Sequence, residues 1–176
     1  MSGVATQTAV YADRIADLHT KVLDTRKTTP GMRVLDKMAV KHGGGTNHRM
    51  GPYDMALIKD NHIKMAGGIT KAVEQVRSNI APEIKIEVET TNLDEVREAI
   101  AAGADIIMLD NMDNATMTEA VAIIKGANPS IKTEASGNMN IPRLKEVAAT
   151  GVDYISVGAL THTVKAMDIS MNIMVD

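Results

Sequence analysis

The sequence predicts an α/β fold: a parallel, barrel-like (β/α) sheet with helices outside it, open or irregular, with six to seven strands. Short apolar runs alternate with helical patterns along the chain. Four of the later runs end at the landmarks Glu89, Asp110, Ser136 and Gly158, which are 21, 26 and 22 residues apart. Each interval suits one strand, one helix and two short loops, the repeating unit of a parallel sheet. We expect one domain over residues 1–176, near the lower size limit of a closed barrel.

The composition limits the class of protein. Hydrophobic residues make up 44% of the chain, but Phe and Trp are absent, so Met and the branched aliphatic residues are expected to fill the core. Without Cys, disulfides, cysteine metal sites and cysteine nucleophiles are excluded. No apolar run approaches about 18 residues, and residues 1–20 lack a continuous apolar core. We therefore expect no membrane span and no secretory signal, and a cytoplasmic location.

Charge is divided unevenly along the chain. Residues 1–71 hold 11 Lys and Arg against 6 Asp and Glu, whereas residues 72–176 hold 8 against 16. A basic half beside an acidic half favours a charged small molecule bound between them. Nucleic-acid binding would call for a broad basic face with stacking aromatic residues, and three Tyr are the only aromatic residues here. Nucleic acid is therefore not an expected partner.

The first expected element is an amphipathic helix between Ser2 and Thr20, with Val10, Ile15 and Leu18 on its apolar face. Such a helix, starting almost at Met1, usually packs on a preceding segment. We therefore expect the chain to be part of a longer protein.

A short strand is expected next, over residues 22–25, followed by the basic pair Arg26 and Lys27 and by the turn signal Pro30-Gly31. A helix should then run from Arg33 to Gly43. Its apolar positions recur at helical spacing at Val34, Leu35, Met38 and Ala39.

Gly43, Gly44 and Gly45 follow this helix and allow two interpretations. A run without side chains can reach positive φ and bring backbone amides close to an anion. Equally, the run can be a helix C-cap followed by a loop. The three residues alone do not decide between the two.

Strands and helices alternate through the remaining chain. Further strands are expected at residues 55–58, 84–89, 104–109, 131–135, 154–157 and, at the end of the chain, 169–173. Helix starts are indicated by Asn92 with Glu95, by Thr116 with Glu119, and by Asn140 with Pro142.

Polar residues follow these strands at their carboxyl ends, where barrels and doubly wound folds place their sites. A single charged residue in this position is usually a solvated turn. Five such ends on one rim instead predict a binding site. Early units contribute cations at this rim, and later units contribute carboxylates and glycines.

Three long motifs carry a family resemblance: residues 24–31 (DTRKTTPG), 43–49 (GGGTNHR) and 57–62 (LIKDNH). Shorter matches follow at residues 87–89, 109–112, 134–137 and 156–162. From Ser2 to Ile173 the chain resembles quinolinate phosphoribosyltransferase, the carboxylating nicotinate-nucleotide pyrophosphorylase of NAD biosynthesis. The complete match in the first two motifs argues against the related molybdenum-associated pyrophosphorylase-like family.

The resemblance implies a reaction and a set of site residues. The family joins quinolinate to phosphoribosyl pyrophosphate with Mg²⁺ and releases nicotinate mononucleotide, pyrophosphate and CO₂. By resemblance, quinolinate is bound by Arg26, His48, Arg49 and Lys59. Lys27 and Lys59 lie near the reacting carboxylate or the phosphates. Glu89 and Asp110 contact the ribose hydroxyls and, partly through water, the Mg²⁺-bound diphosphate. Ser136, Gly137 and Gly158 hold a phosphate. The catalytic residues are Lys27, Lys59, Glu89 and Asp110.

Family members also carry an N-terminal α/β sandwich domain, which in their dimers covers the neighbour's site and supplies a further arginine. No segment here corresponds to it, so the activity of this chain alone is open. The surface that the absent domain would cover should be apolar and favour self-association, so a homo-oligomer is expected. The alternative is a truncated or engineered barrel that binds phosphate or substrate with weak or no catalysis, as a scaffold or folding model. Asn138 also replaces a glycine that many relatives have.

Overall fold

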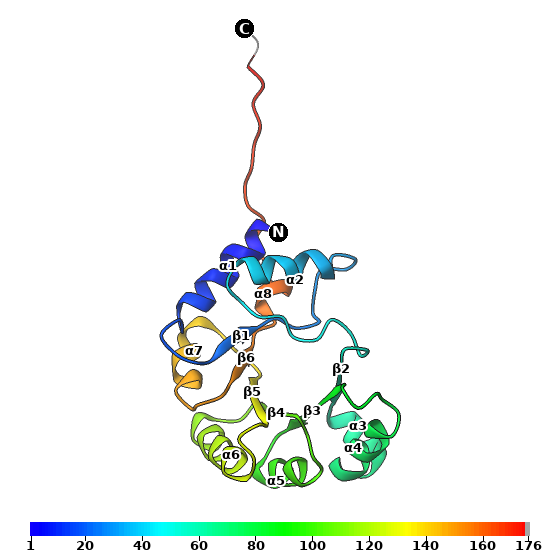
Figure 1. Ribbon diagram of the computed structural model, residues 1–176. Helices are drawn as coiled ribbons and strands as arrows, with labels where there is room; N and C mark the ends of the chain where they lie inside the picture. The colour runs from blue at the N-terminus through cyan, green and yellow to red at the C-terminus, as the bar shows by residue number, and fades with distance from the viewer. Residues whose placement is uncertain (175–176) are drawn as a thin grey trace.

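The computed structural model describes residues 1–174. Six parallel strands form one curved sheet in the order β1-β6-β5-β4-β3-β2, and the helices lie outside it (Figure 1). The strands are β1 (Lys21–Leu23), β2 (Met55–Ile58), β3 (Lys85–Thr90), β4 (Ile106–Asp110), β5 (Lys132–Ser136) and β6 (Tyr154–Ser156). The helices are α1 (Ser2–Asp13), α2 (Arg33–His42), α3 (Asp60–Ala66), α4 (Ile69–Arg77), α5 (Leu93–Ala101), α6 (Asn114–Ala127), α7 (Ile141–Ala148) and α8 (Ala159–His162).

The sheet is open, because its end strands β1 and β2 do not pair with each other. The chain between α2 and β2 crosses this opening (Figure 1). Thr46 makes one rung with β1: its amide donates to Val22 O (2.8 Å) and its carbonyl accepts from Asp24 N (3.1 Å). The predicted α/β class, parallel sheet and barrel-like form are thus confirmed, with six strands in the described part of the chain.

Aliphatic residues of the strands make most of the core. Ile86, Val88, Ile107, Leu109 and Ile155 have no exposed surface. The buried methionines are Met108, Met112, Met117 and Met139, whereas Met65, Met171 and others are exposed. Methionine therefore contributes less to the core than the composition indicated.

The packing face of α2 differs from the predicted one. Val34 and Met38 are 60% and 45% exposed, while Asp36 and Lys37 are buried. Polar contacts turn this face of the helix inward. Asp36 Oδ2 accepts from Thr29 N (2.8 Å), and Lys37 forms a buried ion pair with Asp24. Val10 of α1, predicted on a buried face, is likewise half exposed.

Other local predictions were also wrong. Residues 169–173 are not a strand but exposed, irregular chain that extends away from the sheet (Figure 1). The first helix ends at Asp13, and α6 begins at Asn114 with Asp113 as its N-cap, earlier than Thr116. The helices α3, α4 and α8 were not predicted.

The glycine run after α2 is a helix end. Gly43 is the C-cap of α2, and Gly44 has φ +83°. A Cβ on Gly45 would lie 2.7 Å from the Thr8 side chain, so the run lets α1 approach closely. The C-cap interpretation is therefore confirmed. Among the described residues, no helix has the length and apolar character needed to cross a bilayer.

Candidate active site

Two adjoining cavities open at the carboxyl edge of the sheet. The first is lined by Asp24, Thr25, Arg26, Lys27, His48, Arg49, Leu57, Lys59, Met108, Glu134, Ser136 and Ser156. The second is lined by Thr25, Lys27, Lys59, Glu89, Asp110, Asn111, Ser136, Gly137, Asn138, Met139, Ser156, Gly158, Ala159 and His162. Because Lys27, Lys59 and Ser136 border both, the two cavities are neighbouring halves of one site.

All ten residues singled out by the sequence line this composite site. Arg26, His48 and Arg49 line the first cavity, and Glu89, Asp110, Gly137 and Gly158 line the second; the other three are shared. Eight of them lie at or just after the carboxyl ends of strands, which a parallel sheet directs to the same edge, whereas His48 and Arg49 come from the loop between α2 and β2. Their chemical roles stay predictions.

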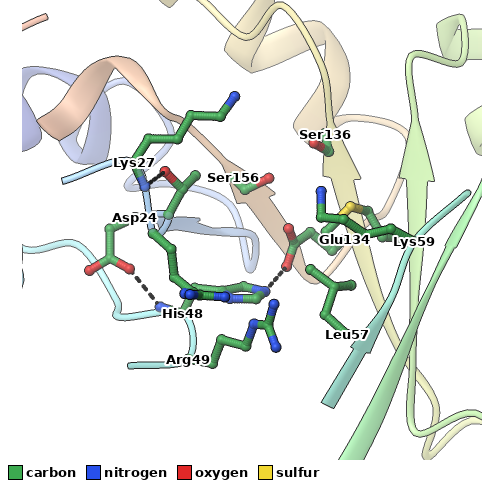
Figure 2. A pocket seen from close by; sticks show the side chains of 12 residues that line it. Asp24, Lys27, His48, Arg49, Leu57, Lys59, Glu134, Ser136 and Ser156 are labelled. Carbon is green, nitrogen blue, oxygen red and sulfur yellow. Dashed lines mark hydrogen bonds and ion pairs between the residues drawn. The ribbon is translucent and has the colours of Figure 1, made fainter. Parts of the chain in front are cut away.

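The first cavity gathers cationic side chains (Figure 2). Arg49 is held by one hydrogen bond, from Nη1 to Met55 O (3.1 Å), and its buried Nε has no partner. Burial and the nearby Arg26 guanidinium lower the pKa of Arg49. Both effects disfavour the charged guanidinium, and an anion bound beside it would relieve them. The cavity is therefore electrostatically suited to an anionic ligand.

A buried ion pair supports this cavity from below. Lys37 Nζ donates to Asp24 Oδ1 (2.5 Å) and to the carbonyl of His48 (2.9 Å), and the His48 amide donates to Asp24 Oδ1 (2.9 Å). Burial raises the pKa of Asp24, and the Lys37 ammonium partly offsets this. The pair fixes the backbone of the loop that carries His48 and Arg49. Sequence reasoning missed Lys37, because the apolar positions of α2 predicted a different buried face.

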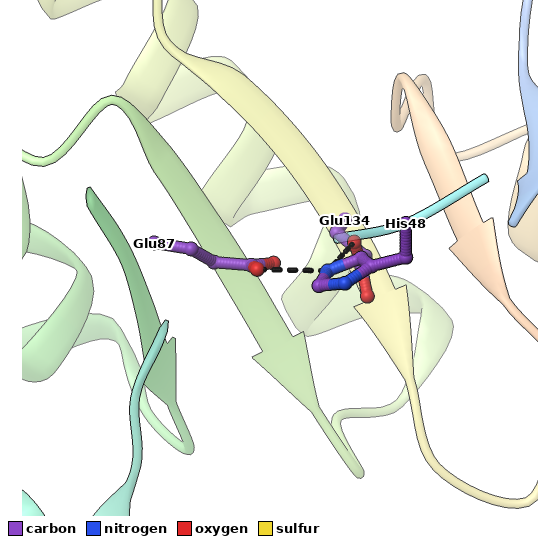
Figure 3. A group of neighbouring side chains, drawn as sticks. All are labelled: His48, Glu87 and Glu134. Carbon is purple, nitrogen blue, oxygen red and sulfur yellow. Dashed lines mark hydrogen bonds and ion pairs between the residues drawn. The ribbon is translucent and has the colours of Figure 1, made fainter. Parts of the chain in front are cut away.

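His48 lies between two buried glutamates (Figure 3). Its Nε2 is 2.8 Å from Glu87 Oε2 and 3.4 Å from Glu134 Oε2, and neither carboxylate is more than 1% exposed. Burial lowers the pKa of His48, but the hydrogen bonds and charges of Glu134 and Glu87 outweigh it and raise this pKa to about 10. Burial and repulsion from Glu134 raise the pKa of Glu87 to about 7 despite its bond to His48. His48 is thus an imidazolium at neutral pH.

The same three side chains also have the composition of a metal site. One ligand atom from each lies within 4.8 Å of the others. A metal would need the lone pair of His48 Nε2. That nitrogen instead carries a proton shared with carboxylates, so the arrangement fits a hydrogen-bonded triad better than a metal centre.

Carboxylates and amides mark the second cavity. Glu89 Oε2 accepts from Lys59 Nζ (3.2 Å), which links the two cavities. Asp110 Oδ2 accepts from Asn111 Nδ2 (2.8 Å), and Asn111 Oδ1 accepts from Asn138 Nδ2 (3.3 Å). Carboxylate oxygens beside open space are the ligands that a hydrated Mg²⁺ prefers, so Glu89 and Asp110 fit such an ion.

The backbone after β5 requires special conformations. Gly137 has φ +94°, and a Cβ there would collide with the Asn111 carboxamide. Asn138 has φ +51°, and Asn111 has φ +54°; asparagine tolerates this left-handed region better than most residues. Asn138 can therefore adopt the positive φ that this turn requires.

Two residues of α8 were missed by sequence reasoning. Thr161 Oγ1 donates to the Lys27 carbonyl (2.7 Å) and so attaches β1's loop to α8. His162 lines the second cavity and approaches Gly158, where a Cβ would lie 2.8 Å from His162 Nε2. Both belong to the 156–162 motif, which was the signal available.

The fold and this site define a class: an α/β barrel-like domain whose rim carries two adjoining cavities, one lined by several cationic side chains and the other by carboxylates and glycines. The chain matches the family Quinolinate phosphoribosyl transferase, C-terminal domain, over residues 4–172. It belongs to this family.

Relatives agree with this assignment. The chain is 52% identical over 174 residues to a probable nicotinate-nucleotide pyrophosphorylase [carboxylating] of Synechocystis sp., covering 99% of this chain and 59% of the relative. The corresponding protein of Bacillus subtilis is 49% identical over 173 residues, covering 98% and 59%. The chain thus spans about three fifths of the length of these relatives.

Solved structures agree in fold. The crystal structure of NadC from Streptococcus pyogenes superposes with a TM-score of 0.91 at 42% identity, covering 97% of this chain and 59% of that one. The nicotinate-nucleotide pyrophosphorylase of Francisella tularensis gives 0.91 at 49% identity, covering 96% and 59%.

Proposed function

We propose that this chain is the catalytic domain of a quinolinate phosphoribosyltransferase. Its reaction would transfer the phosphoribosyl group of phosphoribosyl pyrophosphate to quinolinate and yield nicotinate mononucleotide, pyrophosphate and CO₂. The observation that carries the proposal is the convergence of Arg26, Arg49 and Lys59 on one cavity that opens into a second, lined by carboxylates and glycines. Family membership supports the same reaction.

Quinolinate would occupy the first cavity. Its two carboxylates need fixed cations, and the planar forks of Arg26 and Arg49 can each hold a carboxylate through two hydrogen bonds. His48 adds a third donor. Lys27 and Lys59, which border both cavities, would lie between the diacid and the phosphates.

Phosphoribosyl pyrophosphate would occupy the second cavity. Ser136, Gly137 and Gly158 line this cavity and would hold its phosphate, and Glu89 and Asp110 would contact the ribose hydroxyls. These two carboxylates would also hold Mg²⁺, largely through its water ligands, and the ion would neutralise charge on the departing pyrophosphate.

The residues would then act by position and charge. The pyridine nitrogen forms a bond to the anomeric carbon as the bond to pyrophosphate breaks, and the carboxylates beside the ribose stabilise the positive charge that develops there. The quaternised ring accepts the electron pair left when the adjacent carboxylate departs as CO₂, and that ring carbon takes up one proton. No protein nucleophile is needed.

A CO₂-release assay tests the proposal. The chain would be incubated with quinolinate labelled in the departing carboxylate, phosphoribosyl pyrophosphate and Mg²⁺, with and without a supplied N-terminal domain from a relative. We expect label release that depends on both substrates and on the cations Lys59 and Arg49. Quinolinate binding without release in either mixture would instead support the alternative of a ligand-binding but inactive barrel.

A further inference from the structure

His48 presents its two ring nitrogens to different surroundings. Nε2 is engaged by Glu87 and Glu134, whereas Nδ1 has no hydrogen-bond partner among residues 1–174. His48 and Glu134 both line the first cavity (Figures 2 and 3). The free nitrogen is therefore the one available to a ligand in that cavity.

The protonation state of the ring decides what Nδ1 offers. In the neutral tautomer that keeps the proton on Nε2, Nδ1 carries a lone pair and repels a carboxylate. In the imidazolium, Nδ1–H is a charged donor and attracts one. A pocket for a diacid needs the second state.

We propose that Glu134 is a positioning residue: with Glu87 it holds the His48 ring by Nε2 and keeps it an imidazolium, so that Nδ1–H can bind a carboxylate of quinolinate. The inference rests on the proposed function for the ligand, but the state of the ring does not depend on any ligand. Glu134 is suited to the role because it is 1% exposed and its Oε2 lies 3.4 Å from His48 Nε2, while its Oε1 has no partner among the described residues.

Other charged groups around His48 act elsewhere. Asp24 accepts from the His48 amide, and Lys37 donates to its carbonyl, so both fix the backbone. Arg26 and Arg49 line the cavity beside the ring and would disfavour its charge. The carboxylates on β3 and β5 are the groups that oppose this effect, and only Glu134 also lines the cavity.

The variant Glu134→Gln tests the inference because it keeps the shape and an acceptor oxygen but removes the charge. In the wild type, the pKa of His48 at about 10 keeps the ring protonated between pH 6 and 8.5, although Glu87, with a pKa of about 7, ionises in this range. Quinolinate affinity should therefore fall far less across this range than in the variant. In the variant, the pKa of His48 falls toward 6.5, and the affinity at pH 8.5 should be at least about tenfold weaker than at pH 6. The exposed Glu83→Gln serves as matched control and should behave as the wild type.

Calorimetric titration with quinolinate measures this profile, and ¹⁵N NMR of the ring nitrogens measures the His48 titration without ligand. Inorganic phosphate binding should be unchanged in Glu134→Gln, which shows that the variant is folded. If the wild type does not bind quinolinate, the proposed function fails, while the NMR titration still decides the role of Glu134. A His48 titration that is the same in wild type and Glu134→Gln would overturn the inference.

Discussion

Arg49 illustrates how one side chain can serve binding more than folding. Within residues 1–174 its side chain makes one hydrogen bond, to Met55 O, and its Nε is buried without a partner. An anionic ligand in the first cavity would supply the partners that Arg49 lacks. Its cost to the free protein is the burial of charge next to another guanidinium.

Arg49→Ala should therefore weaken quinolinate binding strongly while changing stability little. Loss of charge-assisted hydrogen bonds costs about 1.5–3 kcal/mol, or roughly 10- to 100-fold in affinity. Calorimetry gives the affinity, and urea unfolding gives the stability. Arg97→Ala, on the exposed side of α5, is the matched control. An unchanged affinity in a folded Arg49→Ala protein would remove Arg49 from the binding site.

Substitutions of Asp24 and Lys37 should instead lower the stability of the fold strongly. Both are buried, so Lys37→Met leaves an uncompensated carboxylate and should cost about 3–5 kcal/mol in unfolding free energy. Adding Asp24→Asn should recover part of that loss, because the stranded charge is gone. Urea unfolding of the two single variants and the double variant measures the coupling. Additive effects would show that the pair does not act as a unit.

At the level of elements, two units repeat a device at the amino edge of the sheet. The helices α5 and α7 end before Gly103 and Gly151, which have φ of +77° and +90°, and each glycine lies two residues before an aspartate. Asp105 Oδ2 accepts from Ile86 N (2.8 Å), and Asp153 Oδ2 accepts from Thr133 N (2.9 Å). Each aspartate thus ties its own strand to the neighbouring one.

The glycine of this device should be distinguishable from a helical glycine. A Cβ would meet nothing within 4 Å at Gly103 or at Gly126, but only Gly103 has positive φ. Gly103→Ala should cost about 1 kcal/mol or more, since the left-handed region disfavours a Cβ. Gly126→Ala, inside α6, should stabilise by about 0.4–1 kcal/mol. Thermal and urea unfolding compare the two; changes of the same sign would contradict this account.

The lowered pKa of Asp153 predicts that the stability of the protein depends on pH. Burial would raise the pKa of Asp153, but hydrogen bonds from Lys125 and Thr133 outweigh it, so this pKa lies below the ordinary 3.8. Its contribution is present above pH 3.8 and is lost as the pH falls through the lower, folded-state pKa. Asp153→Asn should therefore be less stable than wild type at pH 7, and this difference should shrink below about pH 4. Asp168→Asn, in the exposed tail, should follow the wild type at both pH values.

Elements were predictable from the sequence where local chemistry and burial agree. Local sequence and burial agree in the apolar strands around Ile86, Ile107 and Ile155, which lie where the patterns indicated. The helix start predicted at Asn92 is also found there. The burial of Lys37 could not be predicted, since it depends on Asp24 reaching it from another element. The His48 triad was missed for the same reason: its members come from a loop and two strands.

Ile169 lies in a segment that was predicted as a strand from its sequence pattern but does not form one. Its neighbourhood alternates apolar and polar residues as a strand would, yet Ile169 is 80% exposed and unpaired. Alternation indicates a preference for pairing, but a strand also requires a neighbouring edge. The candidate site residues were easier to place, because a parallel sheet brings every strand's carboxyl end to one edge whatever the details of the helices.

At the scale of the whole molecule, the opening of the sheet and the site are connected. The strands β1 and β2 form the two ends of the sheet, and they are followed by Arg26 and Lys59 respectively. A dianion in the first cavity would contact cations from both ends at once. The ligand would thereby link β1 and β2, which share no backbone hydrogen bonds.

Quinolinate should consequently slow hydrogen exchange at β2, Met55–Ile58, whose strand pairs only with β3. At a concentration 100 times its Kd, it should also add about 2.7 kcal/mol to the unfolding free energy. Phosphate is the control, because the second cavity lies mainly against β4, β5 and β6. It should add stability by the same mass action without specific protection of β2. Equal protection of β2 by both ligands would mean that any binding stabilises the whole sheet, whereas protection by quinolinate alone requires a ligand that bridges its two ends.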